Sequence, residues 1–172
     1  MFQAAPRMQA LPFSGIRVMM EKANRMARDG IDVIHMEIGR PDFDTPQLIK
    51  DALYQSVQGG NVFYTSNYGT NELRQAICRK LARDNRITYA PEEILVTVGV
   101  GEGTYAAIAA FLNEGDEILV PDPVWLNYLH VPQFFGAKPV TYGLREGNGY
   151  QIDPEELSRL ITPRTKMLIL NT

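Results

Sequence analysis

The hydrophobic pattern changes its rhythm part-way along the chain, near Pro91. Before that residue, apolar positions recur at helical spacing, as in the stripe of Leu73, Ile77 and Leu81, and Ser, Thr, Pro and Gly stand where helix ends are expected. Three helices are predicted for this region. The first is Ser14–Asp29, the second runs from Pro46 to Gly59-Gly60 with Thr45 as its N-cap, and the third begins at Thr70. A short strand is predicted within 31–39.

After Pro91, short apolar and β-branched runs alternate with helical patterns. The runs predict strands at Ile94–Val98, Glu117–Val120, Pro139–Tyr142 and Met167–Leu170. Helices are expected between them at Thr104–Leu112, around Trp125–Phe135 and at Asp153–Ile161, the last with a capping pattern of Asp153 and Glu156. This alternation predicts an α/β fold, a mostly parallel sheet with helices on both faces.

Composition narrows the class of protein. The chain has 172 residues, 45% hydrophobic and 22% charged, which fits one domain, or one domain and part of another. A net charge of −3 gives no electrostatic reason to expect nucleic acid or a membrane as a partner. The single cysteine, Cys78, excludes an intrachain disulfide and fits the cytoplasm, and His35 and His130 alone indicate no metal site.

The stretch "VTVGVGEGTYAAIAA" carries the first chemical signal. Gly99, Gly101 and Gly103 lie between a predicted strand and a predicted helix, an arrangement that directs free backbone N–H groups at an anion, most often a phosphate. Ligands of open α/β sheets bind at the carboxyl ends of the strands, where Trp125 is also expected. The pair suggests a ligand with a phosphate and a flat ring, although a tight turn and plain core packing of Trp125 explain each feature separately.

Two common nucleotide motifs do not match. A P-loop requires Gly-Lys-Ser/Thr, which is absent from the sequence. The dinucleotide fingerprint Gly-x-Gly-x-x-Gly is one position out of register here, although Asp122 lies at a distance suited to a ribose. A nucleotide-binding α/β domain therefore stays as the minor alternative.

Six segments in order resemble the class I/II aminotransferases, the pyridoxal-phosphate enzymes of the aspartate aminotransferase fold. They are "IGRPDFDTP", "YGTNELRQAI", "EEILVTVG", "LNEGDEILVPDPVW", "GAKPV" and "ITPRTKMLILN". The resemblance extends from about Ile16 to Thr172. It implies a transaminase that moves an amino group between an amino acid and a 2-oxo acid, with other pyridoxal-phosphate chemistry, such as lyase or decarboxylase reactions, as the alternative.

The resemblance also implies roles for individual residues. The backbone at Val100, Gly101 and Glu102 would hold the cofactor phosphate, and Trp125 would stack on the cofactor ring. Gly39 would lie against the substrate carboxylate, and Ile16 would be part of an apolar lid or an ordinary helix residue. Tyr64 would reach the phosphate of a neighbouring subunit, so the resemblance implies that the complete protein is a homodimer.

The same resemblance suggests that the large domain is incomplete. Residues 1–45 would be an N-terminal arm and a small-domain segment, and 46–172 the first part of the large cofactor-binding domain. No catalytic residue is expected within the chain, because the Schiff-base lysine would follow Thr172, so these residues alone would be inactive. A regulator with a fused DNA-binding domain is disfavoured, since the arm begins at residue 1.

Gly101 departs from the pattern of one subgroup. Some bacterial aspartate enzymes resemble one another in carrying a lysine at this position, where it meets the acidic side chain of the substrate. A glycine here favours an uncharged or aromatic amino acid as the substrate.

Overall fold

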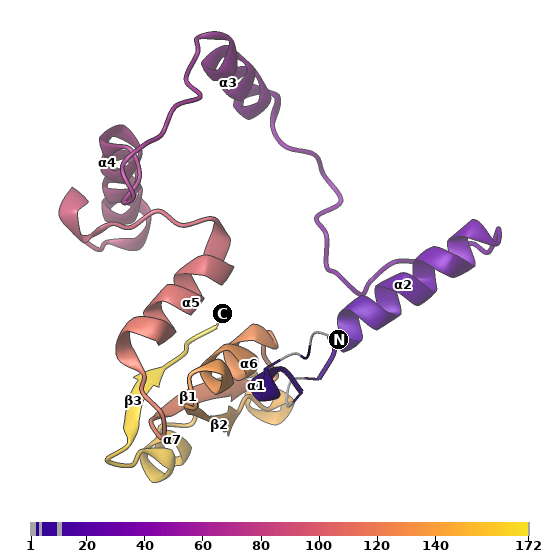
Figure 1. Cartoon of the computed structure of the whole chain (residues 1–172), viewed down its shortest axis with the longest axis vertical. Helices are drawn as coiled ribbons and strands as arrows, with labels where there is room; N and C mark the ends of the chain where they lie inside the picture. Colours follow the sequence, from indigo (N-terminus) through magenta and orange to yellow (C-terminus); the bar gives the residue numbers. More distant parts are fainter. Residues whose placement is uncertain (1–2, 4, 10–11, 172) are drawn as a thin grey trace. The chain divides into compact units, whose positions relative to one another are not determined.

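The computed structural model describes residues 3, 5–9 and 12–171, and it divides into two compact units. The first unit comprises 1–12 and 97–172, and the second comprises 13–96. Figure 1 traces the elements of each along the chain. The parallel sheet lies in the first unit, whereas the second contains helices and connecting segments.

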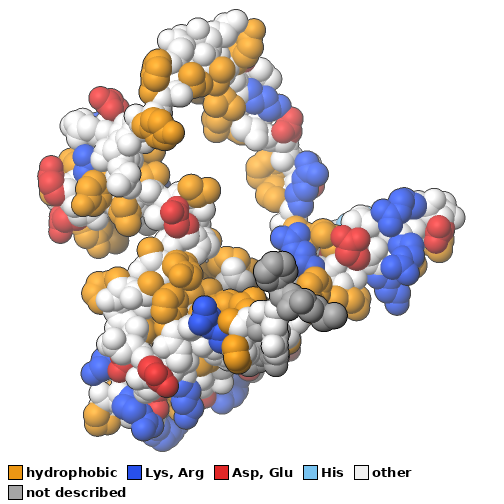
Figure 2. All heavy atoms as spheres, in the orientation of Figure 1, with side chains coloured by type: hydrophobic (Ala, Val, Ile, Leu, Met, Phe, Trp, Pro, Cys, Tyr) orange, Lys and Arg blue, Asp and Glu red, His pale blue; other side chains and the backbone are white. Residues whose placement is uncertain are grey.

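The second unit contains the helices that the apolar spacing predicted. They are α2 (Gly15–Arg28), α3 (Gln47–Gln58) and α4 (Asn71–Lys80), followed by a π-helical turn at Leu81–Asn85 and a 3-10 turn at Pro91–Glu93. The Thr70 side chain caps α4, accepting a hydrogen bond from the Leu73 N–H at 3.3 Å. Pro46, rather than Thr45, is the N-cap residue of α3. Hydrophobic side chains of α3, among them Leu48 and Leu53, lie on the surface (Figure 2).

Two predicted strands are wrong. Residues 31–39 form no strand, and Ile34 and Met36 are exposed. Ile94–Val98 also forms no strand; its Val96 N–H donates to the Tyr68 carbonyl at 3.1 Å, and its Ile94 N–H donates locally to the Pro91 carbonyl at 3.2 Å. Local β-branched composition favours an extended chain, but a strand also needs a neighbouring strand, and none lies beside either segment among the described residues.

The first unit contains a three-stranded parallel sheet in the order β2-β1-β3. Its strands are β1 (Glu117–Asp122), β2 (Lys138–Gly143) and β3 (Thr165–Leu168). All three strand predictions are confirmed within two residues at each end, and β3 both begins and ends two residues earlier than expected. Backbone bonding continues past β3, where the Ile169 N–H donates to the Leu119 carbonyl at 2.8 Å.

Helices cover both faces of this sheet, as predicted. The helices of the unit are α1 (Pro6–Gln9), α5 (Gly99–Phe111), α6 (Asn127–Phe134) and α7 (Pro154–Leu160), with a 3-10 turn at Glu146–Asn148. On one face, Ile118 and Val120 of β1 are fully buried against Ile108 of α5. Leu119 points to the other face because successive strand residues alternate, and it borders a hollow with Leu157 of α7.

Candidate cofactor site

The three glycines are part of a helix rather than a loop before it. Helix α5 begins at Gly99, five residues ahead of the predicted Thr104. Gly99 has φ +71°, which a residue with a Cβ rarely adopts, and this lets the extended chain turn abruptly into the helix. Gly103 lies against the incoming chain, since a Cβ there would be 3.2 Å from Thr97 Oγ1. The low helix propensity of glycine explains why the sequence pattern placed the helix start too late.

The first turn of α5 presents free backbone donors. Its N-cap residue is Val98, whose side chain has no oxygen to cap the helix. The Gly99 N–H donates to the Thr97 carbonyl at 2.9 Å, whereas the N–H groups of Val100 and Gly101 meet no acceptor among the described residues. Glu102 is the fourth residue after the N-cap residue, the position at which an N–H makes the first bond inside a helix. Free N–H groups of this kind at the positive end of a helix suit an anion.

Trp125 lies beside this turn. It precedes α6 and packs edge-on against Tyr128, with the ring centroids 5.5 Å apart and the planes at 88°. A Cβ on Gly101 would be 3.8 Å from Trp125 Cη2, so the helix start and the indole edge are near neighbours. The indole is 40% exposed and therefore not a core side chain. The structure thus brings Val100, Gly101, Glu102 and Trp125 together.

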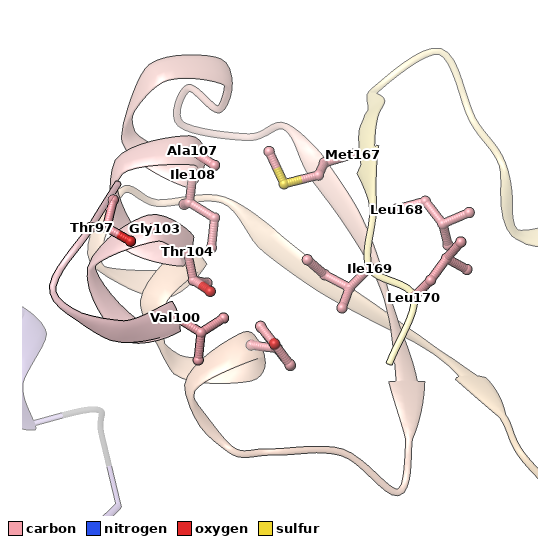
Figure 3. Close-up of a pocket in the computed structure, with 11 residues that line it drawn as sticks. Thr97, Val100, Gly103, Thr104, Ala107, Ile108, Met167, Leu168, Ile169 and Leu170 are labelled. Atoms are coloured by element: carbon pink, nitrogen blue, oxygen red, sulfur yellow. The ribbon is translucent and has the colours of Figure 1, made fainter. Parts of the chain in front are cut away.

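A cavity of about 420 Å³ opens between α5 and β3 (Figure 3). Val100, Thr104 and Ile108 face it from the helix. Met167 and Ile169 point toward the helix, whereas Leu168 and Leu170 point to the other side of the strand. The wall is mostly apolar, and its polar side chains are the hydroxyl-bearing Thr97, Thr104 and Tyr128.

Three predicted site residues lie in the second unit. Gly39 has φ +68° and borders a cavity of about 400 Å³ with His35, Glu37 and Arg40. Tyr64 is fully exposed in its loop, and Ile16 is exposed in α2. Their participation in one site with Trp125 stays a prediction.

One hydrogen bond between side chains borders the cavity next to Gly39. His35 Nδ1 lies 2.8 Å from Glu37 Oε1, and this hydrogen bond lowers the pKa of the Glu37 carboxyl. The cavity has no cluster of three metal-ligating side chains, and none occurs elsewhere among the described residues. None of the described helices has both the length and the apolar character needed to cross a bilayer.

Sequence reasoning missed two side chains at the start of α5. The Thr97 hydroxyl donates to the Gly99 carbonyl at 3.0 Å, and the Glu102 carboxylate accepts a hydrogen bond from the Val98 N–H. The sequence predicts a role for the backbone of Glu102 and none for its side chain. A glutamate in the first turn of a helix whose N-cap residue has no polar side chain was the available signal.

The family model for aminotransferase class I and II matches residues 31–172. The chain belongs to this family. It is 40% identical over 168 residues to the aspartate aminotransferase of Bacillus sp. strain YM-2, covering 98% of this chain and 43% of that enzyme.

Solved structures agree with this assignment. The aspartate aminotransferase of Thermus thermophilus with maleate has a TM-score of 0.94 at 35% identity and matches 100% of this chain and 45% of its own. The alanine aminotransferase of Pyrococcus furiosus has a TM-score of 0.90 at 34% identity over 96% of this chain and 43% of its own. The chain therefore spans less than half the length of these relatives.

The residues at the start of α5 fit the cofactor of this family. Class I and II aminotransferases generally depend on pyridoxal phosphate. The free N–H groups of Val100 and Gly101 suit its phosphate, and the partly exposed Trp125 suits a flat ring.

Proposed function

We propose that the complete protein transfers an amino group between an amino acid and a 2-oxo acid with pyridoxal phosphate as its cofactor. The observation that carries this proposal is the pair of unpaired N–H groups, those of Val100 and Gly101, in the first turn of α5 next to the Trp125 ring. Membership of the aminotransferase family supports the same reaction.

The chain's own groups bind and orient the cofactor in this proposal. The N–H groups of Val100 and Gly101 donate to the phosphate, and the helix end adds a favourable positive potential for a dianion. Trp125 packs on the ring and keeps water from that face. When bound, the cofactor withdraws electrons from the substrate α-carbon, so its ring has to be held in a fixed orientation.

The substrate would meet Gly39 and Ile16. Gly39 has no Cβ, so its backbone can approach a carboxylate closely, and Ile16 would contribute to an apolar lid. Gly101 offers no cation for an acidic side chain, which favours an uncharged or aromatic amino acid. The relatives compared above are named for aspartate and for alanine.

A homodimer belongs to the same proposal, with Tyr64 completing the phosphate site of the partner subunit. The fully exposed Tyr64 and the apolar surface of α3 in Figure 2 support an interface on the second unit. We also propose that residues 1–45 form an N-terminal arm and a small-domain segment, and that residues 46–172 belong to the large domain. A cytoplasmic location is part of the proposal as well, because the single cysteine suits a reducing compartment.

Absorption spectroscopy of the complete protein tests the reaction. The protein loaded with pyridoxal phosphate should absorb near the visible-ultraviolet boundary, and the band should change when an amino acid is added without a 2-oxo acid. The amount of 2-oxo acid formed should equal the amount of cofactor whose absorption band is lost. Release of ammonia or carbon dioxide in place of a transferred amino group would reject transamination.

A further inference from the structure

The α5 helix is capped differently from α4 and α7 in the same chain. Thr70 and Asp153 cap α4 and α7 with their own side-chain oxygens, which accept from N–H groups of the first turn. The N-cap residue of α5 is Val98, which has no such oxygen. The Glu102 carboxylate instead reaches back over the turn and accepts from the Val98 N–H.

This arrangement resembles half of a capping box, with the acidic residue four positions after the N-cap residue instead of three. In the complete motif, the N-cap side chain accepts from the first turn, while an acidic side chain accepts from the N-cap N–H. Here only the second bond exists, so the N-cap N–H is satisfied and the first turn keeps its donors free. We propose that Glu102 is a positioning residue: its carboxylate fixes the 98–102 turn so that the N–H groups of Val100 and Gly101 remain available for the cofactor phosphate.

The charge of Glu102 makes this role specific. A carboxylate beside a phosphate would repel it if the carboxylate were free to turn toward the anion. The bond to Val98 holds Oε2 on the N-cap backbone. Thr97 fixes the same turn from the other side through the bond from its hydroxyl to the Gly99 carbonyl. The inference rests on the proposed function, since it takes the phosphate as the ligand of this turn.

Amide exchange tests the bond without any cofactor. In the cofactor-free complete protein, Glu102→Ala should speed exchange at the Val98 amide roughly tenfold, because a hydrogen bond to a charged acceptor is lost. Glu102→Gln keeps a side-chain oxygen, so its exchange should stay close to that of the unchanged protein. Glu146→Ala is the charge control, since its carboxylate takes part in no hydrogen bond among the described residues.

Titration with inorganic phosphate tests the consequence. Glu102→Ala should bind phosphate several-fold more weakly than the unchanged protein, and Glu102→Gln at least as tightly. The proposal is overturned if Val98 exchange is unaffected in Glu102→Ala, or if both variants bind phosphate more tightly, which would mean that the carboxylate only repels the anion. If the complete protein showed the expected exchange pattern but no amino transfer, the proposed function would be rejected. The role of Glu102 in shaping the turn would still be supported.

Discussion

The Arg164 guanidinium lies 2.9 Å from a carboxylate oxygen of Glu117, whose side chain is almost fully buried where β1 begins. The Thr162 hydroxyl donates to the other carboxylate oxygen at 2.6 Å. The backbone forms a third link, since the Glu117 N–H donates to the Arg164 carbonyl at 2.8 Å. These bonds attach the start of β1 to the segment that leads into β3, and so help to set the register of the two strands.

The first prediction concerns acid stability. The hydrogen bond from Thr162, and then those from Arg164, lower the pKa of the Glu117 carboxyl. A lowered folded-state pKa means that the stabilisation is present above the ordinary glutamate pKa of about 4.3 and is lost as the pH falls through the folded value. Urea unfolding of the complete protein at a series of pH values should therefore show stability falling below that point.

Glu117→Gln should remove part of this dependence and lower stability at neutral pH, because a neutral amide holds Arg164 less well. Glu146→Gln serves as the control and should keep the original slope. Equal slopes for all three proteins would show that Glu117 does not titrate as its contacts indicate.

A second prediction tests the cap of α7. Asp153 Oδ1 accepts from the Glu155 N–H at 2.9 Å and the Glu156 N–H at 3.3 Å. Asp153→Ala should lower the free energy of unfolding by about 1 kcal/mol, as is usual for loss of an N-cap. Asp153→Asn retains an acceptor and should lose far less, and denaturant unfolding of both variants measures the difference. Similar losses in the two variants would speak against a capping role.

Asp153 and Glu156 also show what the sequence could predict. The cap itself was predicted from local chemistry and is confirmed. The reciprocal capping-box bond was expected from Glu156, but that carboxylate binds Arg145 at 2.8 Å and the Gly143 N–H at 3.2 Å instead. Arg145 lies eleven residues away, so no pattern within the helix could indicate it.

The same distinction separates correct from wrong strands. Glu117–Val120 was predicted correctly because its apolar run is buried on both faces and has neighbours on each side. Ile94–Val98 is similarly rich in Ile, Leu and Val, yet it forms no ladder, since pairing depends on another segment and not on its own residues. At the site, spacing found the glycines and Trp125, whereas the bond from Val98 to Glu102 needed the backbone path of the turn.

A third prediction concerns the turn that packs on this unpaired segment. Gly69 has φ +95°, and a Cβ there would lie 2.6 Å from Val96 Cγ2. Gly60 has a similar φ of +79° with nothing within 4 Å of a Cβ. Gly60→Ala should therefore lower the free energy of unfolding by about 1 kcal/mol, the cost of a left-handed backbone at a residue with a Cβ.

Gly69→Ala should lower the free energy of unfolding by the same amount and by about 1–3 kcal/mol more, because its Cβ would clash with Val96. Chemical denaturation of the two variants side by side measures the difference. If they were equally stable, the contact between Gly69 and Val96 would not be part of the folded protein.

The fourth prediction concerns Trp125. In the complete protein, Trp125→Ala should weaken binding of pyridoxal phosphate up to about tenfold, the size expected from loss of an aromatic pair. Trp125→Phe keeps a flat ring and should retain most of the affinity. Fluorescence or absorption titration measures both, and circular dichroism checks that each variant is folded. A folded Trp125→Ala variant with unchanged cofactor affinity would leave Trp125 with only its packing on Tyr128.

The last prediction is that these 172 residues do not catalyse amino transfer by themselves. A transaminase needs a lysine amine at the cofactor ring, and the chain has five lysines. Lys138 and Lys166 lie at the amino ends of β2 and β3. The cavity beside the start of α5 extends instead to Leu170, beyond the carboxyl end of β3, so these two lysines lie at the opposite edge of the sheet. Lys50 is bound by Asp44, and Lys80 donates to Asn85 at 2.7 Å.

Borohydride reduction of the 172-residue chain with pyridoxal phosphate, followed by peptide mapping, checks this prediction. We expect scattered partial labelling without turnover, because exposed amines react slowly and no lysine is oriented on a ring that Trp125 holds. Treating the complete protein in the same way should label one lysine stoichiometrically, at a position outside these residues. Stoichiometric labelling of one of the five lysines together with amino transfer by the short chain would contradict both this prediction and the placement of the cofactor at Trp125.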